Sequence, residues 1–353
     1  MTELRRLSIN GFRGLDSLEI DGFSKVNLFV GKNNAGKTSI LEAIFLLTGM
    51  SNPMLANTIN QIRGLNVGSA KQLGYLFYGL NAKSKPSFSA WFSDSSERTL
   101  RIEAKYKQNE SLTSTSSALG PELVGLDLNF REEKSGPILK SSLVFVDDNL
   151  GNNLINHTLP ECYAERFHST LVVDRIQNNP SMLMRLSEII KRKQEDAVLE
   201  ALKKFDDSIA AIRVLPDNIF FDLKNMDELM PINVMGDGVR RFLNIVTSAF
   251  EKKNSFVCID EIENGLHCSA YKLLWKSLLS FSNLNGIQLF ITTHNIETLA
   301  CLKNVLEEKE FGQMRECAKV FTISRTKNSG LKAYRYSFEG FRDAIEFDSE
   351  IRD

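Results

Sequence analysis

The chain has 353 residues, of which 42% are hydrophobic and 25% are charged, so it can bury a substantial core in one large or two modest domains. This composition excludes fibrous, collagen-like and wholly disordered proteins. Lysine and arginine number 43 against 44 aspartate and glutamate, and the formal net charge of −1 gives no overall attraction to nucleic acid or membranes. Any binding of a polyanion must come from a local basic patch.

The N-terminus and the cysteines indicate the compartment. The first residues lack the apolar core of a secretory signal, and no uncharged apolar run reaches the roughly 18 residues that a membrane span needs. We therefore expect a cytoplasmic protein without a membrane-spanning segment. The five cysteines form no CxxC pair, so we expect reduced, mostly buried thiols rather than disulfides or zinc ligands.

Residues 1–50 predict strands followed by a loop and a helix. Apolar runs at 4–9, 18–20 and 26–30 are typical of strands. After Lys37 the apolar residues recur at helical spacing, and Thr48-Gly49 provides a stop signal.

Residues 86–175 predict extended structure. Turns rich in Ser, Gly and Asp separate apolar runs at 88–92, 100–106, 123–130 and 143–146. We expect a mostly antiparallel, β-rich subdomain or insertion in this region.

The pattern becomes helical and heavily charged over 180–205, and a second helix is predicted over 237–250. Two short apolar strands then flank a predicted helix, at 256–259, 269–281 and 287–292, and a last strand is predicted at 320–324. Near-continuous apolar strands that alternate with helices are typical of a parallel sheet.

The segment Gly31–Thr38, GKNNAGKT, fits the phosphate-loop pattern G-x-x-x-x-G-K-[ST] between a strand and a helix. Glycines let the backbone curl so that its N–H groups point at phosphate oxygens. Lys37 is expected to reach the β- and γ-phosphates of ATP, and the Thr38 hydroxyl to bind Mg²⁺. The bland alternative is a Gly-rich turn with a solvated lysine. The residues expected to contact the nucleotide here are Asn33, Asn34, Ala35, Gly36, Lys37, Thr38 and Ser39.

Two carboxylates follow the apolar strand at 256–259, at the edge of a parallel sheet where ligands bind. We expect Asp260 to hold Mg²⁺ and Glu261 to act as general base on the attacking water. A helix N-cap is the alternative for such a pair. His294 follows the next strand and is expected to sense the γ-phosphate, with a partly buried histidine as the alternative.

Five motifs together resemble a known family. They are INGFRG at 9–14, GKNNAGKTSILEAI at 31–44, MGDGVRR at 235–241, CIDEIENGLH at 258–267 and ITTHN at 291–295. The chain is similar to ABC-type ATPases of the RecF, SMC and OLD (overcoming lysogenisation defect) branch, and most closely to stand-alone OLD-like AAA-type ATPases of bacterial antiphage systems.

This resemblance implies an α/β fold, an ABC ATPase (P-loop NTPase) head with a mixed sheet. It implies a single domain over 1–353, with the β-rich subdomain at 86–175, a helical lobe carrying the signature motif at 180–250, and a half with Walker B and the switch histidine at 251–353. It also implies Mg²⁺-dependent hydrolysis of ATP to ADP and phosphate.

Site roles follow from the resemblance position by position. Lys37, Glu261 and His294 match catalytic residues, and Arg13 matches an arginine that contacts nucleotide phosphates or the loop that senses them. The signature turn, Gly236, Asp237 and Gly238, is expected to complete the ATP site of an opposite subunit. Here Gly236 stands where the usual pattern has a serine, so only backbone N–H groups remain as donors.

Two further family elements are less regular in this sequence. The segment 264–267 resembles the loop that crosses the dimer seam in this family. Gln61 and Gln72 are both candidates for the glutamine that helps bind the metal, and we select Gln72.

The resemblance also suggests what the ATPase controls. Full-length OLD nucleases append a metal-dependent TOPRIM domain, and 303–353 lacks its acidic motif, so we expect no intrinsic nuclease. The region between the phosphate loop and the signature lacks heptads for coiled-coil arms. We expect a homo-oligomer, a dimer through its ATP sites, that acts as sensor or scaffold for a separate effector such as a TOPRIM-type nuclease in antiphage defence.

The alternative is a RecF-like repair or recombination ATPase that binds DNA. Lys191, Arg192 and Lys193, with Lys203 and Lys204 expected further along the same helix, are the basic residues for such contacts. A solvated helix face is the competing interpretation, because acidic residues lie among them.

Overall fold

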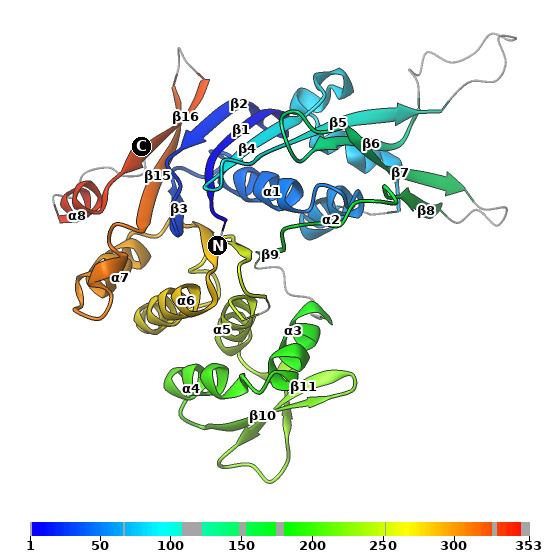
Figure 1. The fold of residues 1–353 in the computed structure, drawn as a ribbon. Coiled ribbons are helices and arrows are strands. Elements are labelled where there is room, and N and C mark those ends of the chain that lie inside the picture. Colours follow the sequence, from blue (N-terminus) through cyan, green and yellow to red (C-terminus); the bar gives the residue numbers. More distant parts are fainter. Residues whose placement is uncertain are drawn as a thin grey trace, which may run out of the picture.

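The computed structural model describes residues 2–65, 68–107, 122–147, 153–173, 180–250, 252–326 and 330–346. Two large sheets lie one above the other in the view of Figure 1, and a smaller lobe of helices and strands, residues 180–250, lies below them. None of the described helices is long and apolar enough to cross a membrane. The fold is α/β with a mixed sheet, as expected.

The mixed sheet has the strand order β16-β15-β3-β14-β13-β9. Its strands are β3 (Val26–Val30), β9 (Ser169–Val172), β13 (Phe256–Ile259), β14 (Gln288–Thr292), β15 (Ala318–Thr326) and β16 (Gly330–Tyr336). All neighbours pair in parallel except β15 and β16. Every residue of the three central strands β3, β14 and β13 is buried, because both faces of the sheet are covered.

One face of this sheet packs on helices α5 (Asp237–Ser248), α6 (Tyr271–Asn285) and α7 (Ile296–Glu307). The opposite face packs on α1 (Lys37–Thr48), so that α1 lies between the mixed sheet and the second sheet. Helix α2 (Met54–Ile62) follows α1, and α8 (Phe338–Glu346) is the last element that the structure describes. The strand at 26–30 and the helix after Lys37 are confirmed.

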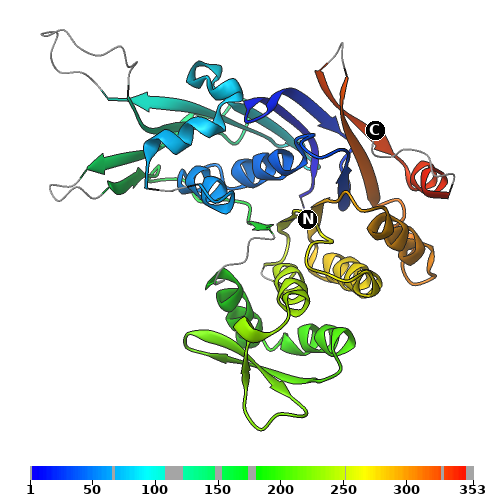
Figure 2. The ribbon, with the colours of Figure 1, turned by 180° about the vertical axis from the view of Figure 1, so that it is seen from behind.

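The second sheet is antiparallel, with the strand order β2-β1-β4-β5-β6-β7-β8. Its strands are β1 (Leu4–Phe12), β2 (Leu15–Asp21), β4 (Ser87–Phe92), β5 (Glu97–Tyr106), β6 (Leu123–Arg131), β7 (Leu139–Asp147) and β8 (Asn153–Thr158). The β-rich region that the sequence predicts is therefore not a sheet of its own, because β4 pairs with β1 (Figure 2). The strand β9 at the end of the same region joins the mixed sheet instead.

The lobe at 180–250 is only partly helical, which corrects the expectation. After α3 (Pro180–Lys191) and α4 (Glu195–Phe205) come three antiparallel strands, β10 (Ile209–Leu215), β11 (Asn218–Leu223) and β12 (Met230–Pro231). The helix predicted over 180–205 is broken, because Lys193 has a φ of 56°. Lys203 and Lys204 therefore lie on α4 and not on the helix that ends at Lys191.

The cysteines also differ from the expectation. Cys258 is buried, whereas Cys162 and Cys268 are exposed and the remaining two are partly exposed. All five are free thiols.

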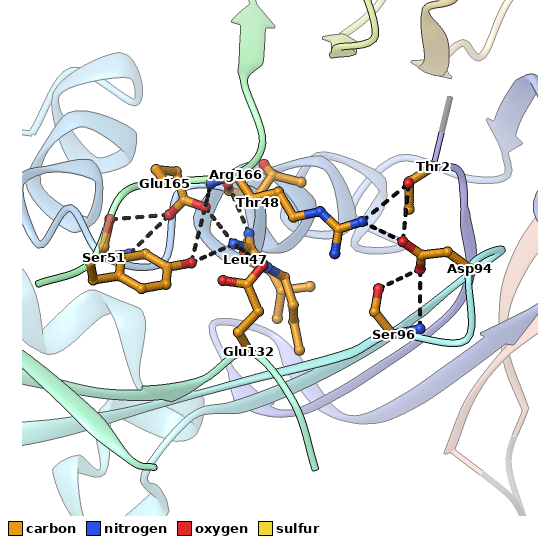
Figure 3. Close-up of polar contacts among 11 residues, drawn as sticks. Thr2, Leu47, Thr48, Ser51, Asp94, Ser96, Glu132, Glu165 and Arg166 are labelled. Carbon is orange, nitrogen blue, oxygen red and sulfur yellow. Dashed lines mark hydrogen bonds and ion pairs between the residues drawn. The ribbon is translucent and has the colours of Figure 1, made fainter. Parts of the chain in front are cut away.

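Arg98 on β5 fixes the C-terminal end of α1 against the antiparallel sheet. Its side chain is 1% exposed, and its Nη1 donates to the carbonyls of Leu47 and Thr48, each at 3.3 Å. Its Nη2 lies 2.5 Å from Glu165 Oε1, while Glu165 Oε2 accepts from the Ser51 hydroxyl at 3.1 Å (Figure 3). A cation at this position satisfies carbonyls that the helix leaves unpaired.

Replacement of Arg98 by leucine should lower the free energy of unfolding by about 3 kcal/mol, because it removes one partner of a buried ion pair. Urea denaturation measures this change. Arg101→Leu is the matched control, since Arg101 lies on the same strand with a side chain that is 55% exposed. Equal stability of the two variants would contradict the role given to Arg98.

Candidate nucleotide-binding site

The loop after β3 is a curled backbone that only certain residues allow. Gly31, Asn34 and Gly36 have φ values of 140°, 63° and 90°. A Cβ on Gly31 would lie 2.4 Å from the carbonyl oxygen of Ile323 on β15, so glycine is required there. Successive residues of this kind turn backbone N–H groups toward one point and form a concave anion site.

Lys37 is folded into this loop. Its side chain is buried, and its Nζ donates to the carbonyls of Gly31 at 2.7 Å and Lys32 at 2.9 Å. Burial lowers the pKa of Lys37, although the charges of Glu261 and Asp260 oppose that effect. When a nucleotide binds, the Lys37 ammonium can exchange these two carbonyls for phosphate oxygens as hydrogen-bond acceptors.

Asp260 is held at the edge of the mixed sheet between two threonines. Its carboxylate accepts hydrogen bonds from Thr38 Oγ1 at 3.0 and 3.1 Å and from Thr292 Oγ1 at 2.6 Å. Burial raises the pKa of Asp260 despite these hydrogen bonds. A buried carboxylate beside a threonine hydroxyl is a donor set that Mg²⁺ prefers, so Thr38 and Asp260 fit the metal expected from the sequence.

Glu261 turns sharply out of β13. Its φ is 45°, its N–H donates to Thr292 Oγ1 at 2.8 Å, and its carboxylate accepts from the Asn264 side chain. The carbonyls of Asp260 and Glu261 accept from Arg241 Nη2 at 2.7 and 3.0 Å. This contact joins α5, the helix that follows the signature turn, to the backbone that carries the two carboxylates.

His294 follows β14 and is 45% exposed in its side chain. Its Nδ1 lies 3.1 Å from Glu263 Oε1, and its backbone N–H donates to the same oxygen at 2.9 Å. The buried Glu263 therefore holds the backbone of His294 in place, although the sequence analysis did not select it. Its position in CIDEIENGLH, two residues after Glu261, was the available signal.

Arg13 lies in a buried ionic cluster behind the loop. Its Nε is 2.6 Å from Glu42 Oε2 and its Nη2 donates to Asn60 Oδ1 at 3.1 Å. Burial lowers the pKa of Arg13 to about 10. Arg63 also pairs with Glu42, at 2.7 Å, and its Nη2 lies 3.4 Å from the Ser39 hydroxyl. Arg63, which sequence reasoning missed, thus contacts the helix that follows the phosphate loop.

Gln72 lies in the 3-10 helix Ala70–Leu76. Its carbonyl accepts from Asn60 Nδ2 at 2.8 Å. In the part of the chain that the structure describes, no hydrogen bond joins Gln72 to Thr38 or Asp260. Its side-chain Oε1 is buried and, among the described residues, has no hydrogen-bond partner, and its metal-binding role stays a prediction.

The signature turn opens outward at the start of α5. Asp237 is 77% exposed and pairs with Arg240. A Cβ on Gly236 would meet nothing within 4 Å, and one on Gly238 would lie 3.4 Å from the carbonyl of Gly265. Among the described residues, the turn makes no hydrogen bond to the phosphate loop of its own chain.

The remaining residues of the phosphate loop are Asn33, Asn34 and Ala35, which precede Gly36. The Ala35 N–H donates to the Lys32 carbonyl at 3.2 Å.

Comparisons with known proteins agree with this geometry. Residues 26–300 match the family described as "AAA domain, putative AbiEii toxin, Type IV TA system". An "ATP/GTP phosphatase" of Helicobacter pylori is 28% identical over 338 residues, covering 87% of this chain and 90% of its own. The segment that matches the family, residues 26–300, includes the phosphate loop, the signature turn, Asp260, Glu261 and His294.

Shorter and more distant similarities point the same way. The "DNA replication and repair protein RecF" of Actinobacillus pleuropneumoniae serotype 5b is 54% identical over 44 residues, which is 12% of each chain. A solved SMC head bound to the C-winged helix domain of ScpA has a TM-score of 0.51 at 13% identity, and covers 95% of this chain and 98% of its own. The chain therefore has the fold of an SMC head.

Lys37→Ala should weaken nucleotide binding about 10- to 100-fold, because it removes a charged donor from the loop. Titration with a fluorescent ATP analogue measures the affinity. Lys32→Ala is the control, since it removes an exposed ammonium from the same loop. An undiminished affinity in Lys37→Ala would count against the whole site.

Asp260→Asn should stabilise the nucleotide-free protein and abolish its further stabilisation by Mg-ATP. Folding raises the pKa of Asp260. Above this raised pKa the buried charge lowers the free energy of unfolding, and this penalty disappears as the pH falls and the carboxylate is protonated. Thermal melting from neutral to acidic pH measures both effects. In the wild type the response to Mg-ATP should weaken as the pH falls, and a response that stays constant would contradict the metal role of Asp260.

Proposed function

Because the chain belongs to this AAA-domain family and is a P-loop ATPase, we propose that two copies bind ATP and Mg²⁺ between them and hydrolyse the nucleotide as a switch. The observation that supports this most directly is the division of the site. The phosphate loop, Asp260 and Glu261 gather at one sheet edge, whereas the signature turn of the same chain opens outward. A second copy is the natural source of the missing half.

Each half has a defined task in this proposal. The loop N–H groups and Lys37 bind and orient the β- and γ-phosphates. Thr38 and Asp260 would hold Mg²⁺, and the bound ion would supply positive charge against the phosphates. Glu261, fixed by Thr292 and Asn264, accepts the proton of the attacking water. His294, whose backbone N–H donates to Glu263, would donate to the γ-phosphate.

The opposite copy contributes its signature turn. The backbone N–H groups of Gly236, Asp237 and Gly238 and the N-terminal end of α5 would approach the γ-phosphate, where the helix dipole favours an anion. Loss of that phosphate on hydrolysis removes the groups that these donors bind, so the two copies separate. A lone copy should hydrolyse ATP slowly.

We propose that this switch controls a separate effector in antiphage defence, and that it does so in the cytoplasm. The family description names a toxin and a toxin–antitoxin system, which is a pairing of two proteins. A TOPRIM-type nuclease is the effector class that the OLD resemblance suggests. Copurification with the product of the neighbouring gene, followed by mass analysis, tests this part.

DNA binding in the manner of RecF is the second candidate, and the identity with RecF over 44 residues favours it. Lys191 ends α3, Arg192 and Lys193 lie in the turn that follows it, and Lys203 and Lys204 lie on α4. Lys191 already pairs with Glu188 at 2.7 Å. Duplex or gapped DNA should raise ATP turnover in this case, and high salt should abolish the rise. If the protein is instead a sensor, DNA leaves turnover unchanged and the effector alters it.

Glu261→Gln should abolish hydrolysis but retain ATP binding, because it removes the general base and keeps the shape of the side chain. With ATP and Mg²⁺ the variant should accumulate as a dimer, which light scattering detects. Glu297→Gln, on the exposed first turn of α7, is a matched control. Unchanged turnover in Glu261→Gln would contradict the assignment of the base.

A further inference from the structure

The lobe at 180–250 contains a groove that the proposed ATPase cycle does not use. Residues of the helices α3 and α4 and of the strand β10 line a groove of about 460 Å³. The helices contribute the apolar side chains of Leu186, Ile190 and Leu199. Glu195 and Asp196, in the first turn of α4, stand at its acidic end.

One wall of the groove is the free edge of a strand. β10 is the terminal strand of its sheet, and four consecutive residues of it, 211–214, line the groove. Leu215 and Asn218 close the two-residue hairpin to β11, so the backbone groups of Ile212 and Val214 point away from β11. Within the described part of the chain, neither residue has a backbone hydrogen bond on that outer side.

The groove also contains an unsatisfied carboxylate oxygen. Glu195 Oε2 is buried and, among the described residues, has no hydrogen-bond partner. A buried acceptor without a donor is costly, and the cost is larger for a charged group. A donor from outside this chain, above all a cation, would remove that cost.

We propose that this groove binds an extended segment of a partner protein that carries a lysine or arginine. The segment would add to β10 as a further strand, hydrogen-bonding to the N–H and C=O groups of Ile212 and Val214. Its apolar side chains would pack on Leu186, Ile190 and Leu199. Its basic side chain would pair with Glu195, with Asp196 nearby to reinforce the preference for positive charge.

The chemistry of the groove selects this occupant over others. Among the charged residues that line the groove, the carboxylates of Glu195 and Asp196 outnumber the one cation, Arg213, so the net charge disfavours the phosphates of nucleic acid. The strand edge supplies backbone groups that suit a peptide. The inference goes beyond the proposed ATPase function and does not depend on it, because peptide binding can be measured without nucleotide.

The test uses a displayed library of random decapeptides, selected on the full-length wild-type chain. The enriched peptides should contain a lysine or arginine within an apolar stretch. A synthetic copy should bind Glu195→Gln about tenfold more weakly than wild type, since a buried charged hydrogen bond is lost. Glu200→Gln is the matched control, because Glu200 lies exposed on the same helix and does not line the groove.

A second variant tests the strand pairing. Val214→Pro removes an N–H that faces away from β11, so it should leave the hairpin intact and abolish peptide binding. Unchanged binding of the fluorescent ATP analogue shows that the variants are folded. The proposal is overturned if no peptide is enriched, if the enriched peptides lack a basic residue, or if they bind Glu195→Gln or Val214→Pro as tightly as wild type.

Discussion

A buried carboxylate, that of Asp260, governs the arrangement of the site. Asp260 lies at the edge of the mixed sheet, where the parallel register of β13 and β14 places it beside Thr292 and the phosphate loop supplies Thr38. Burial disfavours its charge, and the pKa is raised accordingly. Burial likewise disfavours the charge of Lys37, whose ammonium is buried among the carbonyls of its own loop. Magnesium and triphosphate would offset both costs of burial, so nucleotide binding would also stabilise the protein.

The rest of the architecture holds this edge in place. Helix α1, which carries Lys37 and Thr38, is fixed at its far end by Arg98 and along its length by the pairing of Glu42 with Arg13 and Arg63. On the other side Arg241 joins α5 to the carbonyls of Asp260 and Glu261. The residues that would contact the phosphates are therefore connected to the signature turn and the lobe at 180–250 through the hydrogen bonds of Arg241 and the helix α5.

Local patterns predicted the site better than they predicted its surroundings. The phosphate loop, β13 and the residues after β14 were recognisable because each motif is a short stretch with its own spacing. The break at Lys193 left no signal, since it depends on a positive φ in a residue that usually avoids one. The three-stranded sheet at 209–231 was hidden because neighbouring helical periodicity dominated the region. Arg13 illustrates the remaining difficulty. Its partner Glu42 lies on the buried helix α1, and pairing across the fold cannot be inferred from the spacing of residues in the sequence.

The most direct test of the shared site is to mix two inactive variants. Lys37→Ala lacks the phosphate-binding lysine, whereas Gly236→Glu should fold normally, since a Cβ there meets nothing within 4 Å, but would place a negative charge against the phosphate of the opposite copy. A mixed dimer contains one intact site, built from the loop of one copy and the signature turn of the other. The account predicts that ATP hydrolysis, absent from each variant alone, returns when the two are mixed. A mixture that stays inactive, or a Gly236→Glu variant as active as wild type, would contradict it.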